Sequence, residues 1–140
     1  MYLLDTVIIS ELRKRQRDAN VAAWVASVGN DDLHLSTVTT YEIQLGIERQ
    51  RAVDPPFADD LARWLDLVVR AYGDRILPLT VAITRRWGRL AAQIGHRELD
   101  LAIAATALEH GLTVVTRNVS HFAPTGVATL DPFQPPARRK

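Results

Sequence analysis

Three acidic residues stand where apolar segments of the chain begin or end. Asp5 closes the run YLLD, Glu42 lies within STVTTYEIQLGI, and Asp100 opens DLAIAATALEHG. A carboxylate at the end of an element can point into a cleft while its apolar neighbours anchor it. Three carboxylates in one cleft repel one another, so such a group persists most easily around a bound cation. All-oxygen ligands suit Mg²⁺ or Mn²⁺, whereas zinc would also require histidine or cysteine.

A cation at such a site could serve the hydrolysis of a phosphodiester. It would bridge carboxylates to phosphate oxygens, lower the pKa of a water molecule and neutralise charge during in-line attack. The residue types therefore suggest a metal-dependent nuclease. Each acid also has a structural alternative: Asp5 as a helix cap, Glu42 as a solvated helix residue, and Asp100 as a favourable charge at a helix N-terminus.

The apolar periodicity predicts the elements that must position these acids. Short apolar runs alternate with amphipathic stretches, and Thr39 is the expected N-cap of the helix that carries Glu42. The segment 117–126 is expected to be a loop. The predicted strands are 2–5, 32–36, 75–79, 112–116 and 127–130, and the predicted helices are 7–15, 20–29, 39–50, 57–68, 83–94 and 99–110.

Strands that alternate with helices predict an α/β fold with a mainly parallel sheet. Ligands of such sheets bind beyond the carboxyl ends of the strands. Asp5, Glu42 and Asn118 all follow predicted strands closely enough to reach one edge, and Asp100 could join them near the start of its own helix.

Length and composition describe one ordinary globular domain. The 140 residues are 47% hydrophobic and 24% charged, with a net charge of +1 and no cysteine. The N-terminal apolar run is too short for a signal peptide or a membrane span, so we expect a cytoplasmic protein with no membrane partner. With no global positive field, nucleic-acid binding would depend on local basic patches, such as residues 13–17. Residues 134–140 are expected to form a flexible basic tail.

Five segments carry a resemblance to a known family. The segments LLDTVIISEL, LSTVTTYEIQLGIER, RILPL, DLAIAATALEHGLTVVTRNVSHF and TGVATLDPF occur in this order. Together they resemble PIN-domain ribonucleases, especially the VapC-type toxins of bacterial toxin-antitoxin pairs, over a single domain at 1–133. The resemblance implies a three-layer α/β/α sandwich, a Mg²⁺- or Mn²⁺-dependent endoribonuclease acting on RNA, a homodimer, and inhibition by a cognate VapB-type antitoxin.

The family's acidic cluster falls on Asp5, Glu42 and Asp100, which the resemblance makes the metal ligands. Asn118 stands where relatives often carry a fourth acid, and we expect it to orient a water molecule or the metal's shell. His121 stands at a further position that is acidic in relatives. Both replacements remove negative charge from the expected site.

Other polar residues of the motifs are candidates for supporting the acids or contacting the substrate. The first motif departs from the family, because Val7 stands where relatives commonly carry Asn. The candidates are Thr6, Ser36, Thr39, Arg117 and His121. Arg117 could contact a phosphate or form a surface salt bridge, and Asn118 could simply form the turn after a strand.

Two other classes of function compete with the nuclease. A phosphatase of the haloacid dehalogenase type also uses an aspartate after its first strand, but it needs a second one where Val7 stands. A catalytically weak or silent protein of the same fold could hold RNA or an antitoxin, and the neutral Asn118 and His121 would permit this. A zinc site is not expected, because none of the histidines has a partner four residues on.

Overall fold

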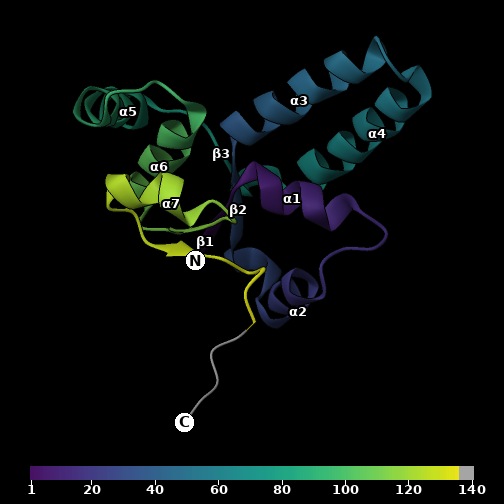
Figure 1. The fold of residues 1–140 in the computed structure, drawn as a ribbon, viewed down its shortest axis with the longest axis horizontal. Helices are drawn as coiled ribbons and strands as arrows, with labels where there is room; N and C mark the ends of the chain where they lie inside the picture. The colour runs from purple at the N-terminus through teal and green to yellow at the C-terminus, as the bar shows by residue number, and fades with distance from the viewer. Residues whose placement is uncertain (136–140) are drawn as a thin grey trace.

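The computed structural model describes residues 1–135, which form a five-stranded parallel sheet with helices on both faces (Figure 1). The strands are β1 (Tyr2–Leu4), β2 (Leu33–Ser36), β3 (Ile76–Leu77), β4 (Thr113–Val115) and β5 (Thr129–Leu130), in the order β3-β2-β1-β4-β5. The helices are α1 (Thr6–Arg13), α2 (Ala19–Ser27), α3 (Thr37–Arg51), α4 (Pro55–Tyr72), α5 (Val81–Ile94), α6 (Leu99–His110) and α7 (Val119–Phe122). Short 3-10 turns are η1 (Asn30–Asp32), η2 (Gly73–Arg75) and η3 (Ala123–Thr125). The predicted three-layer α/β/α fold is confirmed.

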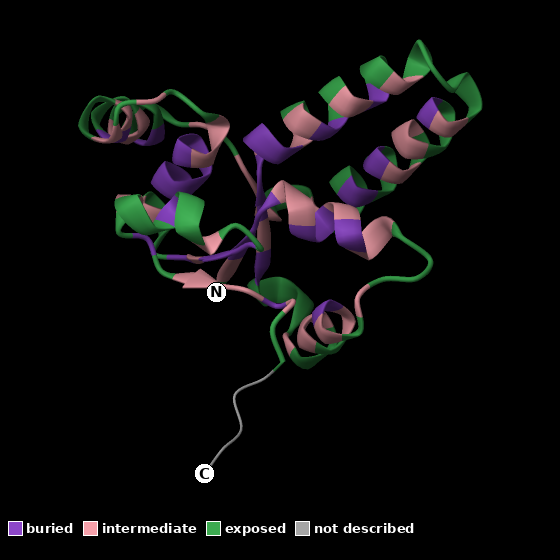
Figure 2. Ribbon diagram, in the orientation of Figure 1, coloured by how far each residue is buried: buried purple, intermediate pink, exposed green. Residues whose placement is uncertain are grey.

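The sheet separates two hydrophobic cores. Because side chains alternate between the faces of a strand, Leu3 and Val114 pack with α5, α6 and α7, while Leu4 and Val115 pack with α1, α2, α3 and α4. All four of these strand residues are fully buried. Figure 2 shows the buried residues on the sheet and on the inward sides of the helices, whereas the far ends of α3 and α4 are exposed. The central strands β1 and β4 are therefore held on both faces.

Helices α1, α3 and α6 all begin at the carboxyl edge of the sheet. α1 and α3 follow β1 and β2 directly, and α6 precedes β4 and so runs back from that edge. The N-cap of α3 is Ser36, whose Oγ accepts the Val38 N–H at 3.0 Å, so the prediction of Thr39 as the cap was wrong. Ser36 caps the helix in place of Thr39 because it is the last residue of the strand and already has the extended backbone that a cap requires.

Helix α6 is the best-buried helix and fixes the position of Asp100. Its residues 101–107 are all buried, and four of the seven are alanines, which allow the neighbouring elements to approach closely. The helix ends at Gly111, whose φ of 65° is left-handed, as the sequence predicts for a C-terminal glycine.

The structure differs from the prediction in three segments. The predicted loop 117–126 contains α7, because Phe122 is fully buried and holds a helical turn against the core. The predicted strand 75–79 is paired only over Ile76–Leu77. Most of the expected basic tail, residues 136–140, lies outside the described residues. Within residues 1–135, no helix combines the length and the apolar character needed to cross a membrane.

Candidate active site

The candidate site lies where the order of the sheet reverses. From β1 the chain builds the sheet outward through β2 and β3, and then returns to place β4 and β5 on the other side of β1. Asp5 follows β1 and Thr116 follows β4, and the Asp5 N–H donates to the Val115 carbonyl at 2.9 Å. In parallel sheets, ligands bind at this reversal, beyond the carboxyl ends of the strands.

Asp5 is a buried carboxylate held on both of its oxygens. Asp5 is only 6% exposed to solvent. Oδ1 accepts the Thr6 N–H at 2.8 Å, and Oδ2 accepts the Thr116 hydroxyl at 2.8 Å. Asp5 therefore does cap α1, as the structural alternative predicts, but it is also fixed across the sheet to β4. Capping and a role in the site are compatible, because each oxygen retains a second lone pair.

Burial raises the pKa of the Asp5 carboxyl to about 6 from an ordinary value of 3.8. The hydrogen bonds from Thr116 and Thr6 oppose this rise, while the negative charges of Asp100 and Glu42 add to it. The three predicted acids thus lie near enough to act on one another. A carboxylate with this environment is costly to ionise unless positive charge is supplied nearby.

Glu42 lies on the second turn of α3 and faces α1. Its Oε1 accepts the Thr6 hydroxyl at 2.7 Å, and the same hydroxyl lies 3.1 Å from Thr39 Oγ1. Burial raises the pKa of the Glu42 carboxyl, the Thr6 hydrogen bond opposes that rise, and the charge of Asp100 adds to it. Thr6 therefore connects two of the acids, donating its N–H to Asp5 and its hydroxyl to Glu42.

Asp100 reaches the site from the first turn of α6, on the opposite face of the sheet from Glu42. Its side chain is 26% exposed, and its Oδ2 lies 3.4 Å from Nδ1 of His121 on α7. The position at a helix N-terminus favours the negative charge, as the structural alternative predicts. The structure thus brings together Asp5, Glu42, Asp100 and His121.

Thr116 is a site residue that the sequence reasoning missed. Its buried hydroxyl donates to Asp5 and also accepts the Asn118 N–H at 3.0 Å, which fixes the turn after β4. Asn118 begins α7 without a side-chain capping bond, and its side chain is exposed. Only the register of the strands identifies Thr116: Leu4 pairs with Val115, so the next residues of the two strands also lie side by side.

Two candidate supporting residues are engaged elsewhere. Ser36 is fully buried and its hydroxyl is used in capping α3. The Arg117 guanidinium stacks over the Phe133 ring, 4.3 Å from its centroid, so it makes a cation–π contact where the alternative interpretation predicted a surface salt bridge.

The donor chemistry of this site fits a hard divalent cation. The three carboxylates present only oxygen atoms, which Mg²⁺ and Mn²⁺ prefer. Within residues 1–135, no three acidic or histidine side chains are positioned to hold an ion together. Mg²⁺ does not require this, since it usually keeps several waters and takes one or two protein carboxylates together with substrate phosphates.

A groove lies beside Glu42, between α1, α3 and α4. It has a volume of about 260 Å³. Thr6 and Glu42 line it together with Arg13, Phe57 and Trp64, and the Arg13 guanidinium lies 5.4 Å from the centroid of the Phe57 ring. A partly apolar groove with a basic side chain therefore lies beside Glu42, the one acid of the site that lines it.

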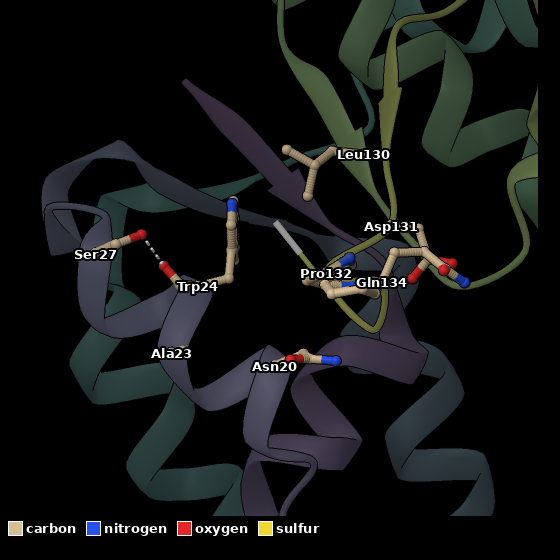
Figure 3. Close-up of a pocket in the computed structure, with 9 residues that line it drawn as sticks. Asn20, Ala23, Trp24, Ser27, Leu130, Asp131, Pro132 and Gln134 are labelled. Carbon is tan, nitrogen blue, oxygen red and sulfur yellow. Dashed lines mark hydrogen bonds between the residues drawn. The ribbon is translucent and has the colours of Figure 1, made fainter. Parts of the chain in front are cut away.

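A second hollow, of about 410 Å³, lies away from the acids between α2 and the C-terminal segment (Figure 3). The Asn20 amide donates to the Phe133 carbonyl at 2.9 Å and ties this segment to α2. Asp131 is the only acid among the lining residues, and it accepts the Phe133 N–H at 2.9 Å. The hollow thus lacks the convergent carboxylates of the candidate site.

Comparisons with known proteins agree with this geometry. The chain is 33% identical to the VapC ribonuclease Y4jK of Sinorhizobium fredii, over 96% of this chain and 99% of the relative. It is 32% identical to the toxin FitB of Neisseria gonorrhoeae, over 95% and 99%. The crystal structure of FitAcB from Neisseria gonorrhoeae superposes with a TM-score of 0.84 at 32% identity, covering 95% of this chain and 99% of that one. The structure of FitAB bound to an IR36 DNA fragment gives the same TM-score at 29% identity, over 99% and 100%.

The residues that match a family model include most of the sheet and all three acids of the site. The model of the PIN domain matches residues 2–123, which include Asp5, Glu42 and Asp100. The resemblance predicted from the five segments is therefore confirmed, and the chain belongs to the PIN-domain family.

Proposed function

We propose that this protein is a metal-dependent endoribonuclease that acts as the toxin of a toxin-antitoxin pair. The observation that carries the proposal is the approach of Asp5, Glu42 and Asp100 to one another at the reversal point of a PIN-domain sheet. The names of the relatives, a VapC ribonuclease and a toxin, support both parts of it. A cytoplasmic location would place such an enzyme with its RNA.

The proposed reaction is hydrolysis of an RNA phosphodiester. Mg²⁺ or Mn²⁺, when bound, would supply positive charge to the phosphate and acidify a water molecule. Asp5, Glu42 and Asp100 would hold the cation directly or through water, and the exposed Asn118 amide would orient a water molecule. Water attacks the phosphorus, the bond to the 3′ oxygen breaks, and that oxygen takes up a proton. The products are then a 3′-hydroxyl and a 5′-phosphate.

The purified protein tests this directly with RNA and Mn²⁺. We expect cleavage that stops with a chelator and falls at least about 100-fold in Asp5→Asn and in Asp100→Asn, because each change removes a charge from the metal site. Asp66→Asn is the matched control, since Asp66 is an exposed acid on α4. Intact RNA at saturating Mn²⁺, or cleavage ends carrying a 2′,3′-cyclic phosphate, would contradict the proposed mechanism.

A silent RNA- or antitoxin-binding protein is the second candidate. It is favoured by the neutral residues Asn118 and His121, which the resemblance to the family places at positions expected to be acidic. Measuring both RNA binding and RNA cleavage, in wild type and in Asp5→Asn, distinguishes the two candidate functions. Binding of RNA without cleavage in wild type, with equal binding by Asp5→Asn, would support the silent protein.

We propose that a VapB-type antitoxin inhibits the enzyme at the groove beside the acids. Two of the similar structures are FitAcB and FitAB, which supports a partner for this chain too. A peptide in the groove could pack on Phe57 and Trp64 and place an arginine against Glu42. Mixing the chain with the product of the neighbouring gene should abolish cleavage. Gly46→Trp, whose new side chain would fill open space in the groove, should weaken that inhibition.

We also propose that the chain is a homodimer, and that residues 1–133 form its single folded domain. Exposed apolar side chains support a dimer: Tyr41 is 57% exposed and Val81 75%. Tyr41, Leu79 and Leu99 also line a hollow of about 230 Å³. Light scattering should give twice the mass of one chain for wild type and a smaller mass for Tyr41→Arg. A wild-type monomer at micromolar concentration would contradict the dimer.

A further inference from the structure

Building on the proposed function, we propose that the basic segment 13–17 binds the phosphate backbone of the RNA substrate at a distance from the scissile bond. The segment contains Arg13, Lys14, Arg15 and Arg17, and it joins α1 to α2. It carries four positive charges in five residues, whereas the whole chain has a net charge of +1. Such a surface would strengthen binding of the substrate without taking part in the reaction at the acids.

The basic segment is tied to the helix before it and to the helix after it. Glu11 on α1 is nearly buried, and its Oε1 lies 3.3 Å from Lys14 Nζ while its Oε2 accepts the Asp18 N–H at 3.4 Å. The Asp18 side chain in turn caps α2, because its Oδ1 accepts the N–H groups of Asn20 and Val21. Burying a charged acid costs free energy unless the charge is paired. Since both side-chain partners of Glu11 belong to the turn after α1, Glu11 holds this turn in place.

The charges of the segment are available to a partner. Figure 1 shows the segment as a loop that projects between α1 and α2, and Figure 2 shows that most of it is exposed. Within residues 1–135, Arg13, Arg15 and Arg17 form no ion pair with an acid. The Arg13 guanidinium lies over the Phe57 ring, a contact that uses one face and leaves its N–H groups free to donate at the edge. A polyanion would relieve the repulsion among these neighbouring cations.

Helix α1 connects the acids with the basic segment. Thr6 at its start donates to Asp5 and Glu42, and Arg13 is its last residue. Thr6, Ser10 and Arg13 all line the groove beside Glu42, so they lie on one side of the helix. Seven residues of an α-helix span about 10 Å. An RNA strand with one phosphate at the acids can therefore extend along α1 and bring other phosphates to the segment.

The residue types favour a phosphate backbone as the partner. Three of the four cations are arginines, whose planar guanidinium groups donate two N–H groups to one phosphate. Contacts to the backbone add affinity for RNA of any sequence and do not choose the bond that is cleaved. The segment should therefore set how tightly RNA is held and leave the cleavage rate of bound RNA unchanged.

Binding of a labelled single-stranded RNA, followed by fluorescence anisotropy with a chelator present, tests the inference without cleavage. The double variant Arg15→Gln and Arg17→Gln removes two phosphate contacts, so the slope of log K against log salt concentration should become shallower by about 1.4. Counterion release of this size corresponds to binding about tenfold weaker at about 200 mM salt. The double variant Arg15→Lys and Arg17→Lys keeps the charges and should retain most of the affinity.

The matched control is the double variant Arg85→Gln and Arg89→Gln. It also removes two exposed arginines, but from α5, which packs on the other face of the sheet. We expect its RNA affinity and salt dependence to stay close to those of wild type. An equal loss in this control would overturn the inference, because only the net charge of the protein would then matter.

Further outcomes separate the inference from the proposed function. With Mn²⁺ present, the glutamine variant of Arg15 and Arg17 should cleave RNA with a KM about tenfold higher and an unchanged kcat. Cleavage by wild type, with the same RNA affinity and salt dependence in this variant, would overturn the role of the segment and leave the nuclease intact. Tighter binding of duplex DNA than of RNA by wild type, lost in the variant, would assign the segment to DNA and overturn the inference too. If wild type binds RNA through the segment but never cleaves it, the proposed nuclease fails and the RNA-binding surface stands.

Discussion

Replacing Asp5 by asparagine should stabilise the metal-free protein, although it should abolish cleavage. Burial raises the Asp5 pKa from 3.8 to about 6, so the folded protein holds this proton more tightly than the unfolded chain. The stability that neutral Asp5 contributes is complete below pH 3.8 and is lost as the pH rises through about 6. Above that range, ionised Asp5 destabilises the folded state. An asparagine at the same position carries no such charge.

The size of the expected stability change follows from the shift in the Asp5 pKa. A rise of about two pKa units corresponds to about 3 kcal/mol once both states are ionised, and to about 1 kcal/mol at pH 4.5, where Asp5 is mostly ionised in the unfolded chain and still protonated in the folded protein. Asparagine can still accept the Thr6 N–H, but the Thr116 hydroxyl loses its carboxylate acceptor, at a cost of about 1 kcal/mol. The variant should therefore match wild type at pH 4.5 and exceed it by about 2 kcal/mol at pH 7.5.

Urea unfolding followed by tryptophan fluorescence, with a chelator present, measures this difference. The control Asp66→Asn changes an exposed acid and should shift the unfolding free energy by less than about 0.5 kcal/mol at either pH. Adding Mn²⁺ at about 100 times its dissociation constant should stabilise wild type by about 2.7 kcal/mol and reverse the order. A variant less stable than wild type at pH 7.5 without metal, or a difference that does not change with pH, would refute the reasoning.

Substitutions at three other positions test the contacts of the site and of its supporting turn. Thr6→Val should lower cleavage at least about tenfold, because Glu42 loses its donor, whereas Thr6→Ser should retain most activity; equal loss in both would mean that the hydroxyl is not what matters. Thr116→Val should raise the pKa of Asp5 above about 6, since it removes the largest opposing hydrogen bond, and a pH titration by carboxyl NMR checks the direction. Phe122→Ala should cost about 3–5 kcal/mol in urea unfolding because it empties a fully buried site beneath α7, and a cost below about 1 kcal/mol would contradict that packing.

The sequence predicted the fold because strands and helices carry different apolar periods. All five strands and the six longer helices occur near their predicted positions, since their burial patterns extend over several residues. Helix α7 has only four residues, too few for a period to be recognised. The cap of α3 was placed wrongly because Ser36 and Thr39 are both good caps by type, and only the end of β2 decides between them.

The acids could be predicted, but not their hydrogen bonds. Asp5 and Glu42 are marked by their place after apolar strands, a pattern contained within a few neighbouring residues. The bond from Thr116 to Asp5 joins residues 111 positions apart and depends on the register between β1 and β4. Without an established pairing of the strands, Thr116 is one of many threonines at the end of an apolar run.

The cost of burying Asp5 is itself evidence for a function. A cap for α1 could be provided by an exposed serine or threonine, which would not carry a charge into the core. Asp5 is instead 6% exposed and stands near two other acids that raise its pKa further. Acids with strongly perturbed pKa values cluster at functional sites, so the presence of Asp5 at the reversal point of the sheet favours a group that meets positive charge there. Capping explains the hydrogen bond to Thr6, but it does not explain why the capping residue is an acid.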